Sequence, residues 1–178
     1  MPKFYGSHQS LLLEVAKIST GPVLELGSGD FSTVQLHEIL KGRKLITFDN
    51  NEEWLNKYVY LKDDFHDFVS GDANAFYQSD NERWGLVFID NGTWEDRIDA
   101  INKYKDTADY LVIHDTEVMR TWELVKQWLT RDLPPMVWDE VFKSWKEFHL
   151  IDYVPLSPYT LVGSNKIDVS NITAEGMI

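Results

Sequence analysis

The chain has 178 residues and a formal net charge of −12, so it lacks the basic surplus with which most nucleic-acid-binding proteins neutralise phosphates. It has no cysteine, which excludes disulfides, thiolate metal sites and a cysteine nucleophile. No apolar run is long enough to span a membrane, and residues 1–6 show no signal-peptide pattern. We therefore expect a single cytoplasmic domain over residues 1–178, with neither nucleic-acid nor membrane partners.

Apolar and amphipathic segments alternate along the first half of the chain, which predicts alternating helices and strands. Leu11, Leu12, Val15 and Ala16 recur at helical spacing after Ser7, which is placed to cap their helix. The elements predicted after this helix are a strand over 22–26, a helix over 32–42, a strand over 44–49, a helix opening at 50–53 and a short strand ending at 70.

The second half contains the two clearest strands. Residues 85–90 and 110–115 are apolar on both faces until their acidic ends, which is typical of central parallel strands covered by helices on both sides. Helical spacing predicts one helix between them and another over 118–129. Segments 145–154 and 159–163 are joined too closely for a crossover helix and predict an antiparallel pair. The pattern is that of a doubly wound, Rossmann-like α/β domain, in which ligands bind at the carboxyl ends of the strands.

A glycine turn follows the first predicted strand, and an acidic residue ends the second. Gly27 and Gly29 permit a tight turn and close approach of a ligand to the backbone. The carboxylate of Asp49 can accept hydrogen bonds from both hydroxyls of a ribose. Together they favour a nucleoside site, with a purely structural strand-to-helix turn as the alternative.

The neighbours of this turn indicate which nucleoside it would bind. A dinucleotide fingerprint requires glycine at position 32, where the chain has Ser32, and Ser32 with Gln35 has the form of a capping box. Glu25 suits the cationic amino group of a methionine moiety better than it suits a diphosphate. These features disfavour a nicotinamide-dependent oxidoreductase and favour a nucleoside with an amino-acid tail.

The run Glu25-Leu26-Gly27-Ser28-Gly29, with Ser32-Thr33 following, resembles motif I of class I S-adenosylmethionine-dependent methyltransferases. More narrowly, it resembles a branch of small methyltransferase-like proteins that carry E-L-G-S-G-x-x-S-T. The resemblance runs from about Tyr5 to Asp168, with further landmarks at 48–51, 71–73, 88–90, 114–117 and 164–168. It implies a seven-stranded, mostly parallel sheet whose last strand is antiparallel.

The resemblance also implies the cofactor and its contacts. S-adenosylmethionine would lie with its methionine part among Glu25, Gly27 and Gly29, its ribose on Asp49, and its adenine against Asp72 and Ala73. The full set of implied cofactor-binding residues is Glu25, Gly27, Ser28, Gly29, Ser32, Thr33, Asp49, Asn50, Asp72, Ala73 and Asp90. One position departs from the family: Phe31 stands where many members carry a third glycine, and its bulk would narrow the methionine pocket.

Asp90, His114 and Asp115 end the two central strands and are the expected catalytic residues. His114 is a candidate general base for a hydroxyl acceptor, with a hydrogen-bonded core residue as the alternative. In metal-dependent catechol-type family members, two carboxylates and a following asparagine hold the cation. Thr116 replaces that asparagine here, so no metal is expected. Asp115 could instead cap the next helix or pair with Arg97 or Arg120, and the remaining histidines, His8, His37, His66 and His149, show no ligand spacing.

The sequence thus predicts methyl transfer from S-adenosylmethionine to an oxygen or nitrogen of a small molecule or glycan. The acceptor site would come from the N-terminal helix, the turn after Asp90 and segment 131–144, or from the second subunit of a homodimer. The alternative is a non-catalytic nucleoside-binding or scaffold member of the same fold.

Overall fold

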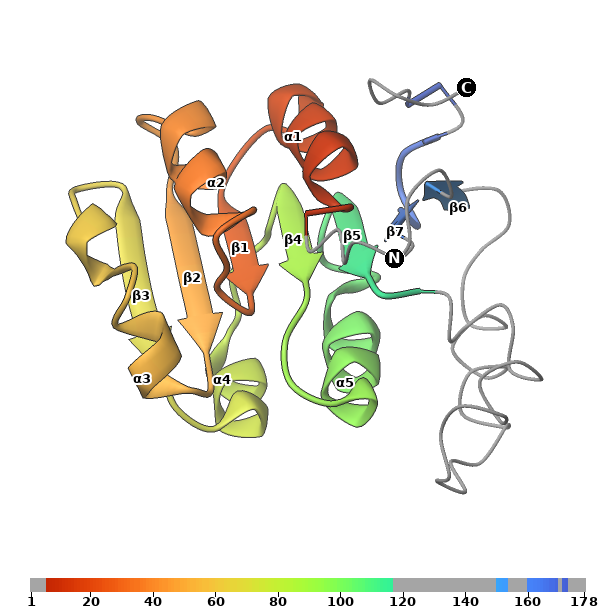
Figure 1. Ribbon diagram of the computed structural model, residues 1–178. Helices are drawn as coiled ribbons and strands as arrows, with labels where there is room; N and C mark the ends of the chain where they lie inside the picture. The colour runs from red at the N-terminus through yellow and green to blue at the C-terminus, as the bar shows by residue number, and fades with distance from the viewer. Residues whose placement is uncertain (1–5, 117–149, 154–159, 170, 173–178) are drawn as a thin grey trace, which may run out of the picture.

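A computed structural model describes residues 6–116, 150–153, 160–169 and 171–172. These residues form one sheet with helices on both faces (Figure 1). The strands lie in the order β3-β2-β1-β4-β5-β7-β6. Their bounds are β1 Val23–Leu26, β2 Leu45–Asp49, β3 His66–Ser70, β4 Leu86–Ile89, β5 Tyr110–His114, β6 Leu150–Tyr153 and β7 Thr160–Gly163.

The strands from β3 to β5 pair in parallel, while β7 pairs antiparallel with both β5 and β6. The mostly parallel sheet and its antiparallel C-terminal strands are therefore confirmed. The strand order reverses between β1 and β4, because β1 leads outward to β2 and β3 on one side and β4 leads to β5 on the other. In open α/β sheets this reversal creates a crevice at the carboxyl ends of the strands.

Helices cover each face of the sheet and enclose two apolar cores. Helices α1 and α2 pack on one face, and α4 and α5 pack on the other. Strand β4 shows why its apolar run is continuous: Leu86 and Phe88 face the α1 and α2 core, and Val87 and Ile89 face the α4 and α5 core. The helical elements are α1 Gln9–Ile18, α2 Thr33–Ile39, α3 Glu52–Leu55, a 3₁₀ turn at Val59–Leu61, α4 Ala73–Ser79 and α5 Trp94–Tyr104.

Two of the helix caps expected from the sequence are wrong. Helix α1 begins at Gln9 after His8, and the hydroxyl of Ser7 contacts the ring of His114 instead of capping the helix. Ser32 precedes α2 but makes no side-chain capping bond, and its hydroxyl lies close enough to the buried carboxylate of Glu25 to lower the pKa of that carboxyl. In both cases the serine hydroxyl lies beside a buried side chain of another element and does not cap the helix.

Helix α3 and strand β3 lie where the sequence predicts them. The helix opening at 50–53 is confirmed, since the side chain of Asn51 accepts a hydrogen bond from Trp54 N at 3.0 Å and caps α3. The third strand ends at Ser70 as expected. The predicted helix over 118–129, together with Arg120 and segments 131–144 and 145–149, lies outside the described residues.

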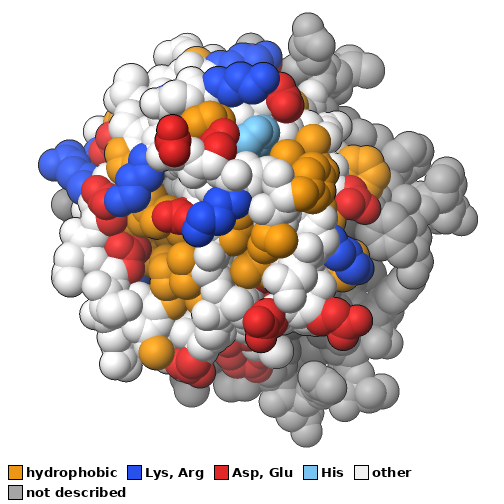
Figure 2. Space-filling view, turned by 90° about the vertical axis from the view of Figure 1, so that its left-hand side faces the viewer, with side chains coloured by type: hydrophobic (Ala, Val, Ile, Leu, Met, Phe, Trp, Pro, Cys, Tyr) orange, Lys and Arg blue, Asp and Glu red, His pale blue; other side chains and the backbone are white. Residues whose placement is uncertain are grey.

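The surface beside β3 mixes charges of both signs. Figure 2 shows this face, where Lys and Arg side chains alternate with Asp and Glu and with apolar patches, so they form no continuous basic surface there. Among the described residues, no helix has the length and apolar character needed to cross a lipid bilayer.

Candidate active site

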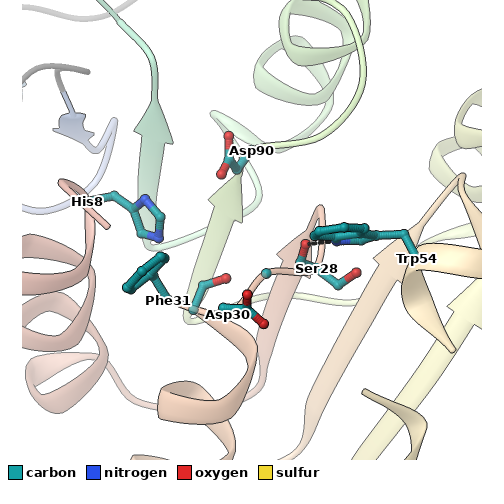
Figure 3. Close-up of a pocket in the computed structure, with 8 residues that line it drawn as sticks. His8, Ser28, Asp30, Phe31, Trp54 and Asp90 are labelled. Carbon is teal, nitrogen blue, oxygen red and sulfur yellow. Dashed lines mark hydrogen bonds between the residues drawn. The ribbon is translucent and has the colours of Figure 1, made fainter. Parts of the chain in front are cut away.

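A cavity of about 360 Å³ opens above the glycine turn, beside the end of β4 (Figure 3). Its lining combines backbone of the turn with aromatic, acidic and histidine side chains, from His8, Ser28, Gly29, Asp30, Phe31, Ser32, Trp54 and Asp90. The indole of Trp54 reaches over from α3 and donates its Nε1 hydrogen to Ser28 O at 2.7 Å. The ring of Phe31 also lines the cavity and is 42% exposed, so this departure from motif I does reach the space that a ligand would fill.

The two glycines of the turn differ in why a side chain is absent at each position. Gly27 has a φ of +92°, and a Cβ there would lie 2.5 Å from Asp90 O, so packing of the turn on the end of β4 requires glycine. A Cβ at Gly29 would make only an ordinary contact, 3.5 Å from Ser32 Oγ. Gly29 lines the cavity, and because it has no side chain, a ligand has room to approach its backbone.

Glu25 lies beneath the turn, away from the cavity. Its carboxylate is 0% exposed and accepts hydrogen bonds from Thr33 Oγ1 at 3.1 Å and Thr47 Oγ1 at 2.7 Å. Burial raises the pKa of Glu25 to about 7, although these hydroxyls oppose the shift. Glu25 is not part of the cavity lining, and its expected contact with the methionine part of the cofactor stays a prediction. Glu25 supports the glycine turn from below, because Thr33 also accepts from Gly29 N at 2.8 Å.

Asp49 ends β2 and is tied to the same turn. Its Oδ2 accepts from Ser28 N at 2.9 Å and from Ser28 Oγ at 2.8 Å, and its Oδ1 accepts from Asn51 N at 2.9 Å. The side chain is 8% exposed. Asp49 therefore fixes the turn in this structure, and a ribose would have to share or displace the contacts with Ser28.

The other residues expected to bind cofactor lie at the same edge of the sheet. Ser28 and Ser32 line the cavity, whereas Asn50, Asp72 and Ala73 are not part of its lining. Asp72 follows β3 and caps α4 by accepting from Ala75 N at 2.8 Å. The turn residues are thus brought together, and the adenine contacts remain predictions.

Arg97 of α5 joins the acidic residues that follow β4 and β5. Its guanidinium donates from Nη2 to Asp90 Oδ1 and from Nη1 to Asp115 Oδ2, both at 3.0 Å. It also donates to the backbone oxygens of Asn91 and His114. The expected pairing of Asp115 with Arg97 is therefore present, and Asp115 has a left-handed φ of 60°, which is uncommon for a residue other than glycine.

His114 lies between the acidic pair and the N-terminal segment. Its Nδ1 lies 3.1 Å from Asp90 Oδ1, and its Nε2 lies 3.0 Å from Ser7 Oγ. Because a carboxylate only accepts, Nδ1 carries a proton, and the neutral ring accepts the Ser7 hydroxyl at Nε2. Burial lowers the pKa of His114, but the hydrogen bond and charge of Asp90, together with the charge of Asp115, outweigh it and leave the pKa raised.

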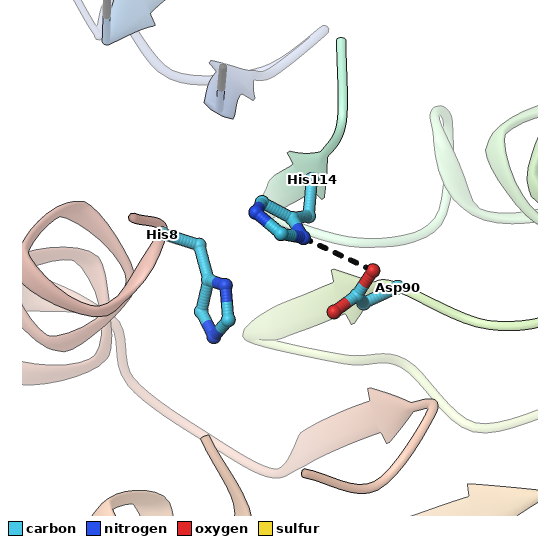
Figure 4. A group of neighbouring side chains, drawn as sticks. All are labelled: His8, Asp90 and His114. Carbon is cyan, nitrogen blue, oxygen red and sulfur yellow. Dashed lines mark hydrogen bonds and ion pairs between the residues drawn. The ribbon is translucent and has the colours of Figure 1, made fainter. Parts of the chain in front are cut away.

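His8 completes this cluster, and sequence reasoning did not select it. Its ring packs edge-on against that of His114, with 4.4 Å between centroids (Figure 4). Burial, followed by the charge of His114, lowers the pKa of His8 to about 4. The backbone of Phe31 lies close enough to affect this pKa, yet neither ring nitrogen has a hydrogen bond of good geometry among the described residues. Asp90 and His114 lie more than 80 positions from His8, and no sequence spacing links residues so far apart. Only the fold shows that the three side chains are neighbours.

Solved structures share this architecture, although no protein-family model and no curated protein sequence matches the chain. A protein from Corynebacterium glutamicum is 17% identical, with a TM-score of 0.65 over 94% of this chain and 84% of its own. The O-methyltransferase TomG from Streptomyces achromogenes, in complex with S-adenosylmethionine, is 15% identical, with a TM-score of 0.63 over 89% and 78%. An O-methyltransferase from Bacillus cereus, in complex with S-adenosylhomocysteine, is 16% identical, with a TM-score of 0.61 over 89% and 80%.

The chain shares the Rossmann-like α/β fold of these solved structures. Its cavity lies at the strand-order reversal of that fold, between the glycine turn after β1 and Asp90 after β4. Membership of the narrower branch with the E-L-G-S-G-x-x-S-T motif stays a prediction.

Proposed function

We propose that this protein is an S-adenosylmethionine-dependent methyltransferase that acts on an oxygen or nitrogen of a small molecule or glycan. The observation that carries the proposal is the cavity above the glycine turn, where the backbone at Gly29 is left open in a chain that shares the fold of solved O-methyltransferases. A turn of this kind lets the backbone approach a ligand closely.

Residues of the turn and of the next strand would hold the cofactor. Gly29, Ser28 and Ser32 would contact it directly, and Asp49 would accept from the ribose while sharing its carboxylate with Ser28. Glu25 and Thr33 would keep the turn in shape from below. The cofactor supplies a methyl group already activated by its sulfonium, so the protein's main task is to align donor and acceptor.

The cluster of Asp90, His114 and Asp115 would handle the acceptor. Arg97 fixes the two carboxylates, which leaves His114 as the member able to take a proton. Both ring nitrogens of His114 already have partners, so an acceptor hydroxyl would have to replace Ser7 at Nε2 or pass its proton through the Ser7 hydroxyl.

Calorimetric titration with S-adenosylhomocysteine tests the proposal without a known acceptor. We expect binding by the wild-type protein, a higher melting temperature with ligand, and no effect of NAD. Absence of any shift at millimolar S-adenosylhomocysteine, with a shift from NAD instead, would refute it.

Two variants separate the roles of Asp49. Ser28→Ala removes one hydroxyl from the carboxylate and leaves the charge in place, whereas Asp49→Asn removes the charge. If Asp49 binds the ribose, Asp49→Asn should weaken binding by roughly 1.5 to 3 kcal/mol for each charged hydrogen bond lost, and by more than Ser28→Ala. Equal losses would show that Asp49 acts only through the turn.

A further inference from the structure

We propose that His8, Asp90 and His114 form a binding site for a divalent transition-metal ion of the Zn²⁺ or Fe²⁺ kind. The three residues come from the segment before α1, the end of β4 and the end of β5, and one ligand atom of each lies within 4.8 Å of the others (Figure 4). The inference goes beyond the proposed function, because ion binding requires neither cofactor nor acceptor.

The state of His8 is the independent sign of a missing ligand. Its side chain is 4% exposed, it points toward Asp90 and His114, and both ring nitrogens lack a well-formed hydrogen bond among the described residues. Leaving a buried polar atom without a hydrogen-bond partner is unfavourable. A metal ion would use one of the two nitrogens as a ligand and remove that part of the cost.

Ion binding requires the three side chains to move closer together. Two ligands bound tetrahedrally to one ion at about 2.1 Å lie about 3.4 Å apart. Ligand atoms as far apart as 4.8 Å would therefore have to approach one another by up to about 1.4 Å. The ion would replace the proton between His114 Nδ1 and Asp90. Arg97 and His114 both contact Asp90 Oδ1, whereas Oδ2 accepts no hydrogen bond from the described residues.

Charge and ligand type decide which ion fits. Asp90 and Asp115 together carry two negative charges, and Arg97 balances one of them, so a cation is favoured. Two imidazoles and one carboxylate suit Zn²⁺, Fe²⁺, Co²⁺ or Ni²⁺, whereas Mg²⁺ prefers oxygen ligands. This site also differs from the all-oxygen one considered from the sequence, because Asp115 is held by Arg97 and is not one of the three ligands.

Three protein ligands leave coordination positions open, and His8 and Asp90 both line the cavity. A hydroxyl or water bound there would lose its proton more readily. The ion would thus offer a way to activate an acceptor oxygen, and in the loaded protein His114 would hold the ion instead of accepting a proton.

Titration with Co²⁺ tests the site directly. Chelator-treated, dialysed protein should bind one Co²⁺ per chain and show the visible absorption of an imidazole-ligated ion, and Zn²⁺ should displace it. His8→Gln removes one ligand at similar volume and should weaken binding by at least about 100-fold, because even residues behind the ligands contribute 10- to 100-fold. His37→Gln is the matched control, because it removes a histidine outside the proposed site. The Nδ1 of His37 lies 3.1 Å from Nδ1 of His66, in another part of the fold.

Several outcomes would overturn the site: no Co²⁺ binding at millimolar concentration, unchanged binding in His8→Gln, or loss of binding only in His37→Gln. If His8→Gln fails to fold, Zn²⁺ titration of the wild-type protein followed by imidazole NMR decides the matter, and perturbation of the His8 and His114 resonances is expected. S-adenosylhomocysteine binding is measured separately, so failure of the metal site and failure of the proposed function remain distinguishable.

Discussion

Replacing Glu25 with glutamine should change how stability depends on pH. The pKa of Glu25 is about 7 in the folded chain against an ordinary 4.5, because its carboxylate is fully buried under the turn. The folded state therefore binds a proton that the unfolded state releases between these values, and stability falls as pH rises through this window. At 1.36 kcal/mol per unit, the wild-type protein loses roughly 3 kcal/mol across the window.

The variant should lack this loss. The glutamine side chain has one acceptor oxygen and cannot accept from both Thr33 and Thr47, so Glu25→Gln loses about 1 kcal/mol of hydrogen bonding, a loss that does not depend on pH. It should be less stable than the wild type at pH 5 and more stable at pH 8.5. Between pH 5 and pH 8.5 the stability of the variant relative to the wild type should change by roughly 3 kcal/mol. For a chain of this length, the difference between their melting temperatures should then change by about 6 to 12 °C.

Urea unfolding at both pH values, followed by tryptophan fluorescence, measures the effect. Burial also lowers the pKa of His66 to about 4, which makes the stability contributed by His66 fall as pH drops. This contribution is present in both proteins and largely cancels in the comparison. A stability difference that is the same at pH 5 and pH 8.5 would show that Glu25 does not titrate between them and would refute the reasoning.

Three further changes probe the site. Gly27→Ala should lower the melting temperature strongly because its Cβ would meet Asp90 O, whereas Gly29→Ala should fold normally and lose affinity for S-adenosylhomocysteine in calorimetry. Arg97→Met should destabilise the protein by about 2 to 4 kcal/mol in urea unfolding, somewhat less than for a fully buried pair because both carboxylates are partly exposed. Once an acceptor is known, His114→Gln should reduce turnover by about 10² to 10⁴ with cofactor affinity nearly unchanged, and full activity would place proton removal elsewhere.

The sequence by itself determined the layers and the edge at which the site lies. Continuous apolar runs such as 86–89 can only be satisfied by cores on both faces, and parallel strands all end at the same edge of a sheet. Asp90, His114 and Asp115 could therefore be placed together from their positions alone. The short connection before β7 likewise required an antiparallel pair, which the structure contains.

Tertiary structure decided what each polar side chain contacts. Ser32 and Gln35 have the sequence form of a capping box, but in the structure Ser32 makes no capping bond and its hydroxyl lies near the buried carboxylate of Glu25. Glu25 itself looked like a ligand-binding residue, and its orientation under the turn depends on Thr47 of a neighbouring strand.

The contacts of the N-terminal segment depend most clearly on the tertiary structure. Ser7 and His114 are 107 residues apart, and they meet because the apolar face of α1 packs against β4 and β5. Apolar packing is non-directional and depends on the whole core. The sequence around Ser7 and His8 therefore does not indicate which distant polar residues this packing brings next to them. His8 shows no ligand spacing in the sequence, although the fold buries it beside Asp90 and His114.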